Sequence, residues 1–243
     1  MRTVNPRWIL IPAFLLAAPM MASEHKGILL TDDEAGATKE TKQIKKEQDD
    51  ILKQLAAGNK KHMSHVSRKD GMAKIMIVSC ADSRVPPEVV FHLQPGEIFT
   101  TRAFGNIVDK VHLASLEYAA EHLHSRVLVV LGHTGCSAVK EAIAEREHPR
   151  VNWQSLNQEA LNAQLEPAVA EVEEAQKVAQ VRTGKSLSGE AMVEAIVKTN
   201  VVSTIHSIRE KSPLLWQLET KDLIRIVGAI YHIETGKVEF IKE

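Results

Sequence analysis

Two cysteines, a histidine and an aspartate stand in two short segments of this 243-residue chain. The first segment is Cys80-Ala81-Asp82-Ser83-Arg84, and the second is His133-Thr134-Gly135-Cys136. Each segment follows a short apolar run, and the chain has no other cysteine. Thiolate, imidazole and carboxylate groups are the ligands that zinc prefers in proteins. The two cysteines, together with Asp82 and His133, are therefore candidate zinc ligands.

The two apolar runs predict where these segments lie in the fold. Ile75–Val78 precedes the first segment and Val127–Leu131 precedes the second. Their length and their β-branched content are typical of buried parallel strands. The carboxyl ends of adjacent parallel strands meet at one edge of a sheet, where α/β proteins bind their ligands. We therefore expect the two segments to come together at that edge.

Two other interpretations of the cysteines are a disulfide and a pair of buried, unreactive thiols. An exported protein favours a disulfide, and free cysteine often packs as a small hydrophobe. Neither interpretation explains why Asp82 and Arg84 flank one cysteine, or why His133 stands three residues before the other. An iron–sulfur cluster would need four cysteines. Zinc is the interpretation that accounts for these neighbours.

The two segments resemble the signature motifs of the β-class carbonic anhydrases. The first motif continues through Val85-Pro86-Pro87-Glu88, and the second includes Gly132. The resemblance covers roughly residues 45 to 243. Beyond the two motifs it rests on Gln94–Phe99, Arg102, Gly105-Asn106, Ser115–Ala119, Asn200-Val201, Ser212–Leu215, Gly228–Tyr231 and Gly236–Val238.

The resemblance implies one Zn²⁺ per chain, held by Cys80, His133 and Cys136. It also implies two states for Asp82, which either ligates zinc or bonds to Arg84 and leaves the fourth position to water. Zinc lowers the pKa of its bound water to near 7, so a zinc-bound hydroxide would hydrate carbon dioxide to bicarbonate. Asp82 and Arg84 are thus the expected catalytic pair, because the planar guanidinium holds a carboxylate with two hydrogen bonds. The alternative is a surface ion pair worth at most about 1 kcal/mol.

Three positions depart from the family pattern. Gly71 stands where some members have a glutamine that reaches toward substrate, Phe104 replaces a small residue, and Ser137 replaces a glycine. These changes concern access to the site. A hydrolase of a carbon dioxide analogue such as carbon disulfide therefore stays open as an alternative, as does a non-catalytic zinc-binding protein.

The predicted fold is α/β, with a mainly parallel central sheet flanked by helices, an N-terminal helical arm and a C-terminal β-hairpin. Residues 23–66 form a polar segment and the arm, Glu40–Lys61, and residues 67–243 form the zinc-binding domain. The hairpin joins Leu223–His232 to Lys237–Ile241. The resemblance implies a homodimer or homotetramer in which the arm packs across a neighbouring subunit.

Residues 1–22 are typical of a secretory signal. Arg2 and Arg7 precede the apolar stretch Trp8–Ala22, which two prolines interrupt. That stretch is short for a membrane span and is broken by prolines, so we expect a cleaved signal and a periplasmic or secreted mature protein without stable membrane insertion. An uncleaved anchor is the less favoured alternative. Lys and Arg number 30 against 31 Asp and Glu, and aromatic residues make up 4%. This balance gives no indication of a nucleic-acid partner.

Overall fold

The computed structural model describes residues 39–63, 73–147, 159, 163, 165–183 and 186–241. The predicted signal peptide, most of the polar segment that follows it, and Gly71 lie outside these residues. The chain divides into two compact units, Met1–Val66 and Ser67–Glu243. None of the helices in the described part of the chain is long and apolar enough to cross a membrane.

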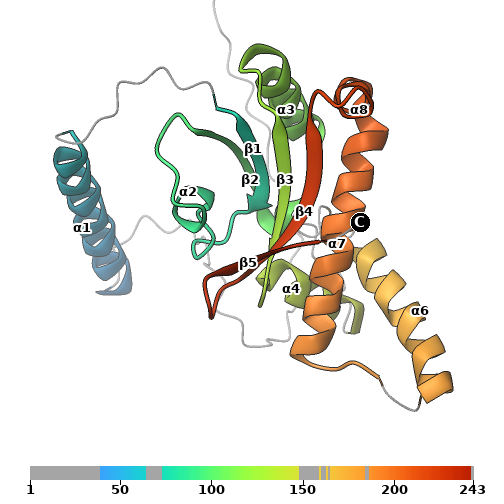
Figure 1. Ribbon diagram of the computed structural model, residues 1–243. Helices are drawn as coiled ribbons and strands as arrows, with labels where there is room; N and C mark the ends of the chain where they lie inside the picture. Colours follow the sequence, from blue (N-terminus) through green and yellow to red (C-terminus); the bar gives the residue numbers. More distant parts are fainter. Residues whose placement is uncertain are drawn as a thin grey trace, which may run out of the picture. The chain divides into compact units, whose positions relative to one another are not determined.

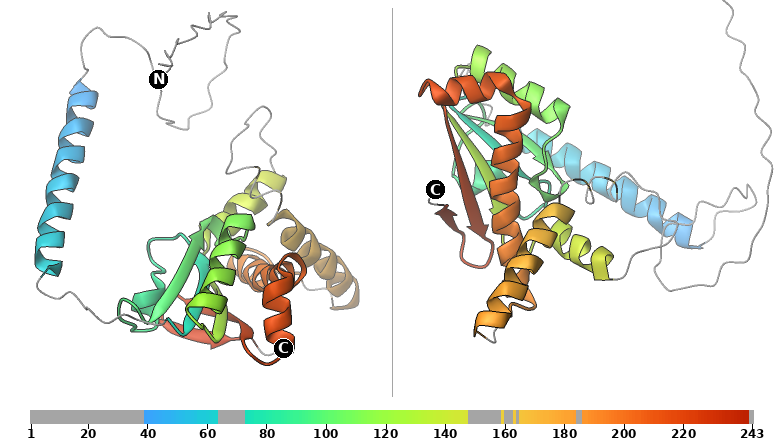
Figure 2. Two further views of the ribbon diagram at one scale, coloured as in Figure 1. Left: turned by 90° about the horizontal axis from the view of Figure 1, so that it is seen from above. Right: turned by 90° about the vertical axis from the view of Figure 1, so that its right-hand side faces the viewer.

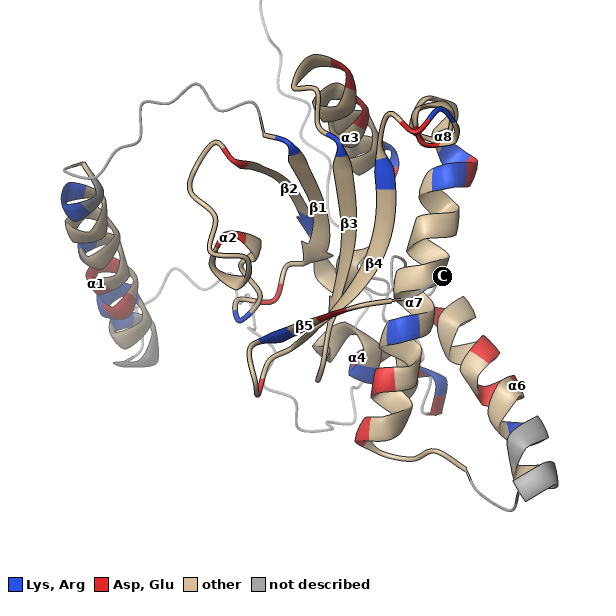
Figure 3. Ribbon diagram, in the orientation of Figure 1, with Lys and Arg blue, Asp and Glu red and all other residues tan. Residues whose placement is uncertain are grey.

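The first unit contributes one described helix, α1 (Lys39–His62), where the sequence predicts the arm. Charged side chains of both signs occur along it (Figure 3). Four apolar side chains, Ile44, Ile51, Leu52 and Leu55, recur at helical spacing and are 46–64% exposed. The helix therefore presents an apolar stripe to its surroundings.

The second unit is built on a five-stranded sheet with the order β2-β1-β3-β4-β5 (Figure 1). The strands are β1 (Ile75–Cys80), β2 (Ile98–Ala103), β3 (Val127–His133), β4 (Arg225–His232) and β5 (Lys237–Phe240). The first four are parallel, and β5 pairs antiparallel with β4. This confirms the predicted mainly parallel sheet and the C-terminal hairpin.

Helices cover both faces of this sheet. Along one face run α3 (Lys110–His122), α7 (Glu190–Lys211) and α8 (Pro213–Thr220), as Figures 1 and 2 show. The short α2 (Pro87–Val90) and its flanks pack against the other face. Near the carboxyl ends of the strands lie η1 (Phe104–Asn106), α4 (Ser137–Glu147) and α6 (Glu166–Thr183). The continuous apolar runs of β1 and β3 follow from this double coverage, because side chains on both faces are buried.

Helix α7 approaches the sheet closely because the strand residues that face it at two positions are glycines, which have no side chain. A Cβ atom at Gly132 would lie 2.7 Å from Val201 Cγ2 and 2.9 Å from Val197 Cγ1. A Cβ atom at Gly228, on the neighbouring strand, would lie 2.8 Å from Val201 Cγ1. Gly132 directly precedes the candidate ligand His133. The packing of α7 therefore positions the end of β3.

Two distant segments that carry the family resemblance meet at the start of α8. The Ser212 hydroxyl accepts a hydrogen bond from the Leu215 amide at 3.2 Å, which caps the helix. The same hydroxyl donates to Glu117 Oε1 on α3 at 2.6 Å. These residues therefore join α3 to α8 and lie outside the candidate site. The sequence motifs indicated similarity here but did not predict α8 as a helix.

Replacing Gly132 with alanine should lower the free energy of unfolding by about 1–3 kcal/mol, because the added methyl group overpacks the contact with Val201. Urea unfolding followed by circular dichroism measures this change. Gly58→Ala on α1 is the matched control, since nothing lies within 4 Å of a Cβ atom there. A Gly132→Ala protein as stable as the wild type would contradict the close packing of α7.

Candidate metal centre

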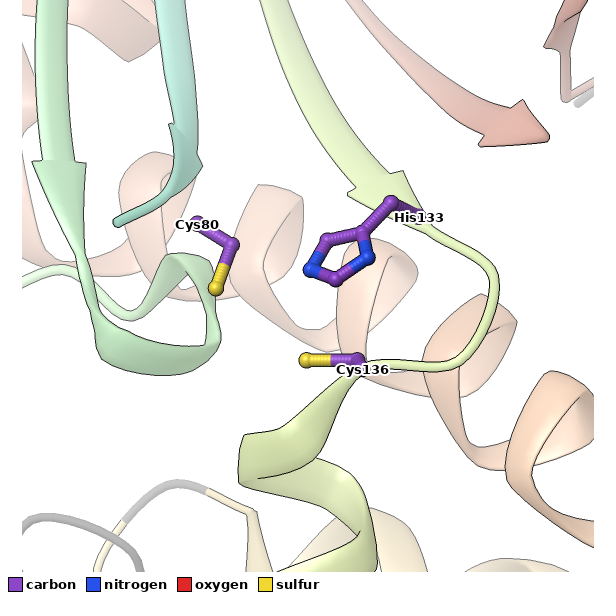
Figure 4. Close-up of side chains that lie close together, drawn as sticks. All are labelled: Cys80, His133 and Cys136. Carbon is purple, nitrogen blue, oxygen red and sulfur yellow. The ribbon is translucent and has the colours of Figure 1, made fainter. Parts of the chain in front are cut away.

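The structure brings Cys80, His133 and Cys136 together at one edge of the sheet (Figure 4). Cys80 is the last residue of β1 and His133 is the last residue of β3, each two residues beyond the predicted strand end. Cys136 directly precedes α4. The ligand atoms of the three residues all lie within 4.8 Å of one another. The predicted convergence of the two segments is confirmed.

This edge is the switch point of the sheet topology. From β1 the chain passes to β2 on one side and then returns to β3 on the other side. The connections therefore diverge between β1 and β3, which leaves the carboxyl ends of these two strands open to a ligand. The site lies where these two connections diverge.

The His133 ring leaves one nitrogen for a ligand. Its side chain is fully buried, and its Nδ1 lies 2.9 Å from the Thr134 carbonyl oxygen. A carbonyl can only accept, so Nδ1 carries the proton and Nε2 carries the free lone pair. Nε2 is buried and has no hydrogen-bond partner. A buried acceptor without a partner fits a bound metal ion.

The two cysteines fit the same ion. Both are free thiols and almost fully buried, so the disulfide interpretation does not describe this structure. The hydrogen bond from the Cys136 thiol is the largest cause that lowers the pKa of Cys80, and the Gly105 amide adds to it against the opposing effect of burial. The bond to Cys80 and burial raise the pKa of Cys136. One proton is thus shared between the two sulfurs. Tetrahedral zinc, with bonds of about 2.0–2.3 Å, places its ligand atoms about 3.5–3.8 Å apart, which suits this cluster.

Asp82 and Arg84 form a two-pronged ion pair beside the cluster. Arg84 Nε donates to Oδ1 at 2.9 Å and Nη2 donates to Oδ2 at 2.6 Å. The Arg84 amide adds a third bond to Oδ1 at 2.9 Å. Asp82 Oδ2 lies 4.0 Å from His133 Nε2. The carboxylate is thus held by arginine, adjacent to the three candidate ligands, and its direct ligation of a metal stays a prediction.

Arg102 on β2 holds the turn that carries Cys80 and Asp82. Its Nε donates to the Cys80 carbonyl at 3.1 Å and its Nη2 donates to the Asp82 carbonyl at 2.7 Å. The sequence motif included Arg102 but assigned it no role. One available signal was its place in a strand, Ile98–Ala103, that contains no other charged residue. A lone arginine in an otherwise uncharged strand indicates a side chain that hydrogen-bonds to groups inside the protein.

Thr134 ties the second motif to the C-terminal hairpin. Its hydroxyl donates to Glu234 Oε2 at 3.0 Å and accepts from the Ile233 amide at 3.0 Å. Arg84 Nη2 reaches the Gly135 carbonyl at 3.4 Å on the same loop. The loop between the two candidate ligands is therefore held from the hairpin and from the first motif.

Two of the three departures from the family pattern lie in the described residues. Phe104 begins η1 and is 38% exposed, and Ser137 begins α4 directly after the second cysteine. Neither belongs to the cluster of candidate ligands.

Comparisons with known proteins agree on one family. The family model described as carbonic anhydrase matches residues 75–238. The chain is 28% identical over 190 residues to carbonic anhydrase 2 of Mycobacterium tuberculosis (strain ATCC 25618 / H37Rv), covering 75% of this chain and 84% of the relative. It is 29% identical over 173 residues to a carbonic anhydrase of Pseudomonas aeruginosa, covering 68% and 72%.

Solved structures show the same fold. The β-carbonic anhydrase of Coccomyxa, solved in complex with acetazolamide, aligns with a TM-score of 0.59 at 23% identity and covers 88% of each chain. A tetrameric β-carbonic anhydrase from Sordaria macrospora aligns with a TM-score of 0.60 at 21% identity, covering 84% of this chain and 98% of the other. At these identities the likeness concerns the fold.

Replacing Arg84 with glutamine should raise the pKa of the Asp82 carboxyl from about 2 toward its ordinary 3.8, because the hydrogen bonds from Arg84 are the main cause of the lowering. The ion pair stabilises the fold above about pH 4, and this stabilisation is lost as the pH falls toward 2. The carboxyl ¹³C shift of Asp82, followed through an acid titration of the metal-free protein, measures both pKa values. An unchanged midpoint in Arg84→Gln would contradict this cause.

Removing metal from the protein with a chelator in air should convert part of Cys80 and Cys136 to a disulfide, since the metal-free sulfurs lie within bonding range after small movements. Thiol titration under denaturing conditions, with and without chelator, counts the remaining thiols. A zinc-loaded sample kept in the same air is the control. Two intact thiols per chain after prolonged chelation would contradict the prediction.

Proposed function

This chain belongs to the carbonic anhydrase family, and from that premise we propose that it catalyses the reversible hydration of carbon dioxide to bicarbonate and a proton. The observation that carries the proposal is a cluster of three buried ligands with an arginine-held carboxylate 4.0 Å away. Structural zinc sites are closed by four protein ligands, whereas catalytic sites use three and keep one position open. The cluster has the second pattern.

Cys80, His133 and Cys136 would hold one Zn²⁺. When bound, zinc supplies the Lewis acid that lowers the pKa of a water molecule to near 7. Two thiolates carry more negative charge than the imidazoles of other zinc sites, and this charge opposes the acidification. Hydrogen-bond donors around the sulfurs, such as the Gly105 amide at 3.3 Å from Cys80 Sγ, offset part of it.

Asp82 orients the attacking water. Its pKa of about 2 keeps the carboxylate ionised at every pH at which the enzyme works, so it can only accept hydrogen bonds. An acceptor fixed by three bonds from Arg84 takes the O–H of the water and leaves an oxygen lone pair directed at the carbon of the substrate. Arg84 thereby acts by holding Asp82. In the alternative state, Asp82 itself would take the fourth ligand position of the zinc. The site would then be inactive, because no position would remain for water.

Two alternatives keep the same zinc site and change its use. Phe104 is 38% exposed and directly precedes Gly105, whose amide contacts Cys80. Its side chain therefore affects how a substrate reaches the metal site. A substrate route altered by Phe104 is compatible with a carbon dioxide analogue, such as carbon disulfide, as the substrate. A non-catalytic zinc-binding protein is the less favoured candidate, because a structural metal has no need for the Asp82–Arg84 pair.

We also propose a homodimer or homotetramer. The exposed apolar stripe of α1 supports this assembly. A tetrameric relative of the same fold supports it as well. Sedimentation equilibrium tests the assembly, and a monomer at assay concentrations would contradict it.

The location is a proposal that rests on the sequence of residues 1–22, which is typical of a cleaved signal. We propose a periplasmic or secreted mature protein. The intact mass of the protein recovered outside the cytoplasm tests the cleavage. A mass that includes these residues would indicate an uncleaved segment.

Asp82→Asn should retain one zinc per chain and lose about 10²–10⁴-fold in kcat/KM for carbon dioxide hydration. The neutral amide is a weaker hydrogen-bond acceptor than the carboxylate, and its NH₂ group can only donate, so it orients the water less well. Stopped-flow hydration from about pH 6.5 to about 9, with zinc quantified on the same samples, measures both quantities, and wild-type activity should rise with pH. The matched control is Asp109→Asn, which keeps the cap of α3.

Two outcomes would count against this mechanism. Near-normal hydration by Asp82→Asn would remove the role given to the carboxylate. A wild-type protein with one zinc and no hydration at any pH would overturn the anhydrase assignment and leave the two alternatives.

A further inference from the structure

The Cys80 sulfur has a backbone partner in η1. The Gly105 amide donates to Cys80 Sγ at 3.3 Å. Gly105 has a φ of 77°, which favours glycine, and a Cβ atom there would lie 3.0 Å from Leu165 Cδ1 and 3.1 Å from Ala138 Cβ. The amide thus reaches the sulfur because the chain turns tightly against α4 and the segment before α6.

Asn200 on α7 holds this turn from behind. Its Nδ2 donates to the Gly105 carbonyl at 3.0 Å and to Asn106 Oδ1 at 3.3 Å. Asn200 is 2% exposed, and its buried neighbours on α7 include Val197 and Val201. An amide in such surroundings is costly unless it is hydrogen-bonded. Its two bonds are therefore specific contacts between α7 and η1.

The turn needs an external anchor to keep its orientation. Gly105 and Asn106 both have positive φ values, 77° and 49°, and both are buried. Two consecutive left-handed residues lack the repeating bonds that fix a helix or a strand. Fixing the Gly105 carbonyl and the Asn106 side chain from α7 also fixes the direction of the Gly105 N–H.

We propose that Asn200 is a positioning residue for Cys80, acting through the Gly105 peptide. The inference rests on the proposed function in one respect, that Cys80 binds the metal. An N–H donated to a metal-bound sulfur withdraws electron density from it and so tunes the metal. Asn200 thereby sets the donor strength of one thiolate from a helix that contributes no ligand.

A purely structural role predicts something different. If Asn200 only satisfied the carbonyl of a buried turn, its loss would lower stability and leave the metal's electronic properties unchanged. The test therefore needs a spectroscopic signal from the sulfur–metal bond in addition to a stability measurement.

The experiment compares wild type with Asn200→Leu, which has similar volume and no donor, after replacing the metal with Co²⁺. Losing the hydrogen bond should shift the thiolate-to-cobalt charge-transfer band to longer wavelength, and zinc affinity should fall about 10–100-fold. Ile205→Val, another buried change on α7, is the control for lost packing. A band and an affinity that match the control would overturn the proposal.

Two additions keep the test decisive if Asn200→Leu does not fold. Asn200→Ala removes the same donor with less steric demand and should give the same shift. In the wild type loaded with ¹¹³Cd, the Gly105 amide proton should show scalar coupling to the metal across the N–H···S bond. Absence of that coupling would overturn the first step, whereas a wild type that binds no metal would overturn the proposed function instead.

Discussion

Two sulfur ligands buried side by side impose the strongest constraint on this structure, because as thiolates they repel each other and carry charge away from water. Hydrogen-bond donors from several elements of the fold surround the two sulfurs. The Gly105 amide contacts Cys80. The bond to Cys80 and burial raise the pKa of Cys136, and amides at the start of α4 oppose that rise. Arg102 places a cation behind the turn that carries Cys80. The arrangement of η1, α4 and β2 around the strand ends follows from this need.

The local part of this arrangement was predictable from sequence. Apolar β-branched runs indicated β1 and β3, and the residues that follow them indicated a shared edge with a metal. These features depend on neighbours in the chain. The strands proved longer than their apolar runs, because Cys80 and His133 continue the ladder as its last residues. Hydrogen bonding between strands set those ends, and hydrophobicity alone does not report it.

The contacts that orient the site were not predictable in the same way. Arg102 and Asn200 act on backbone atoms 20 and 95 residues away in the chain, so no local pattern reveals their targets. The Ser212 cap followed by Pro213 is a local helix-start signal that could have predicted α8. The bond from the Ser212 hydroxyl to Glu117 on α3, in contrast, spans 95 residues. Such bonds form only after the sheet and helices have assembled. The spacing of residues in the sequence can predict metal ligands, but it cannot predict the distant groups whose hydrogen bonds orient those ligands.

The partner of His133 Nδ1 is a backbone carbonyl, that of Thr134, and the donor to Cys80 is a backbone amide. Both contacts belong to the main chain, which every residue possesses. Exchange of a side chain cannot delete either contact directly, although it can move the turn that presents it. These two contacts depend on residue identity only through the turns that present them, so substitutions that preserve those turns leave both contacts in place. Gly105 is excluded from that tolerance, because its φ of 77° favours glycine. That tolerance ends at residues such as Asn200, whose side chains hold those turns in place.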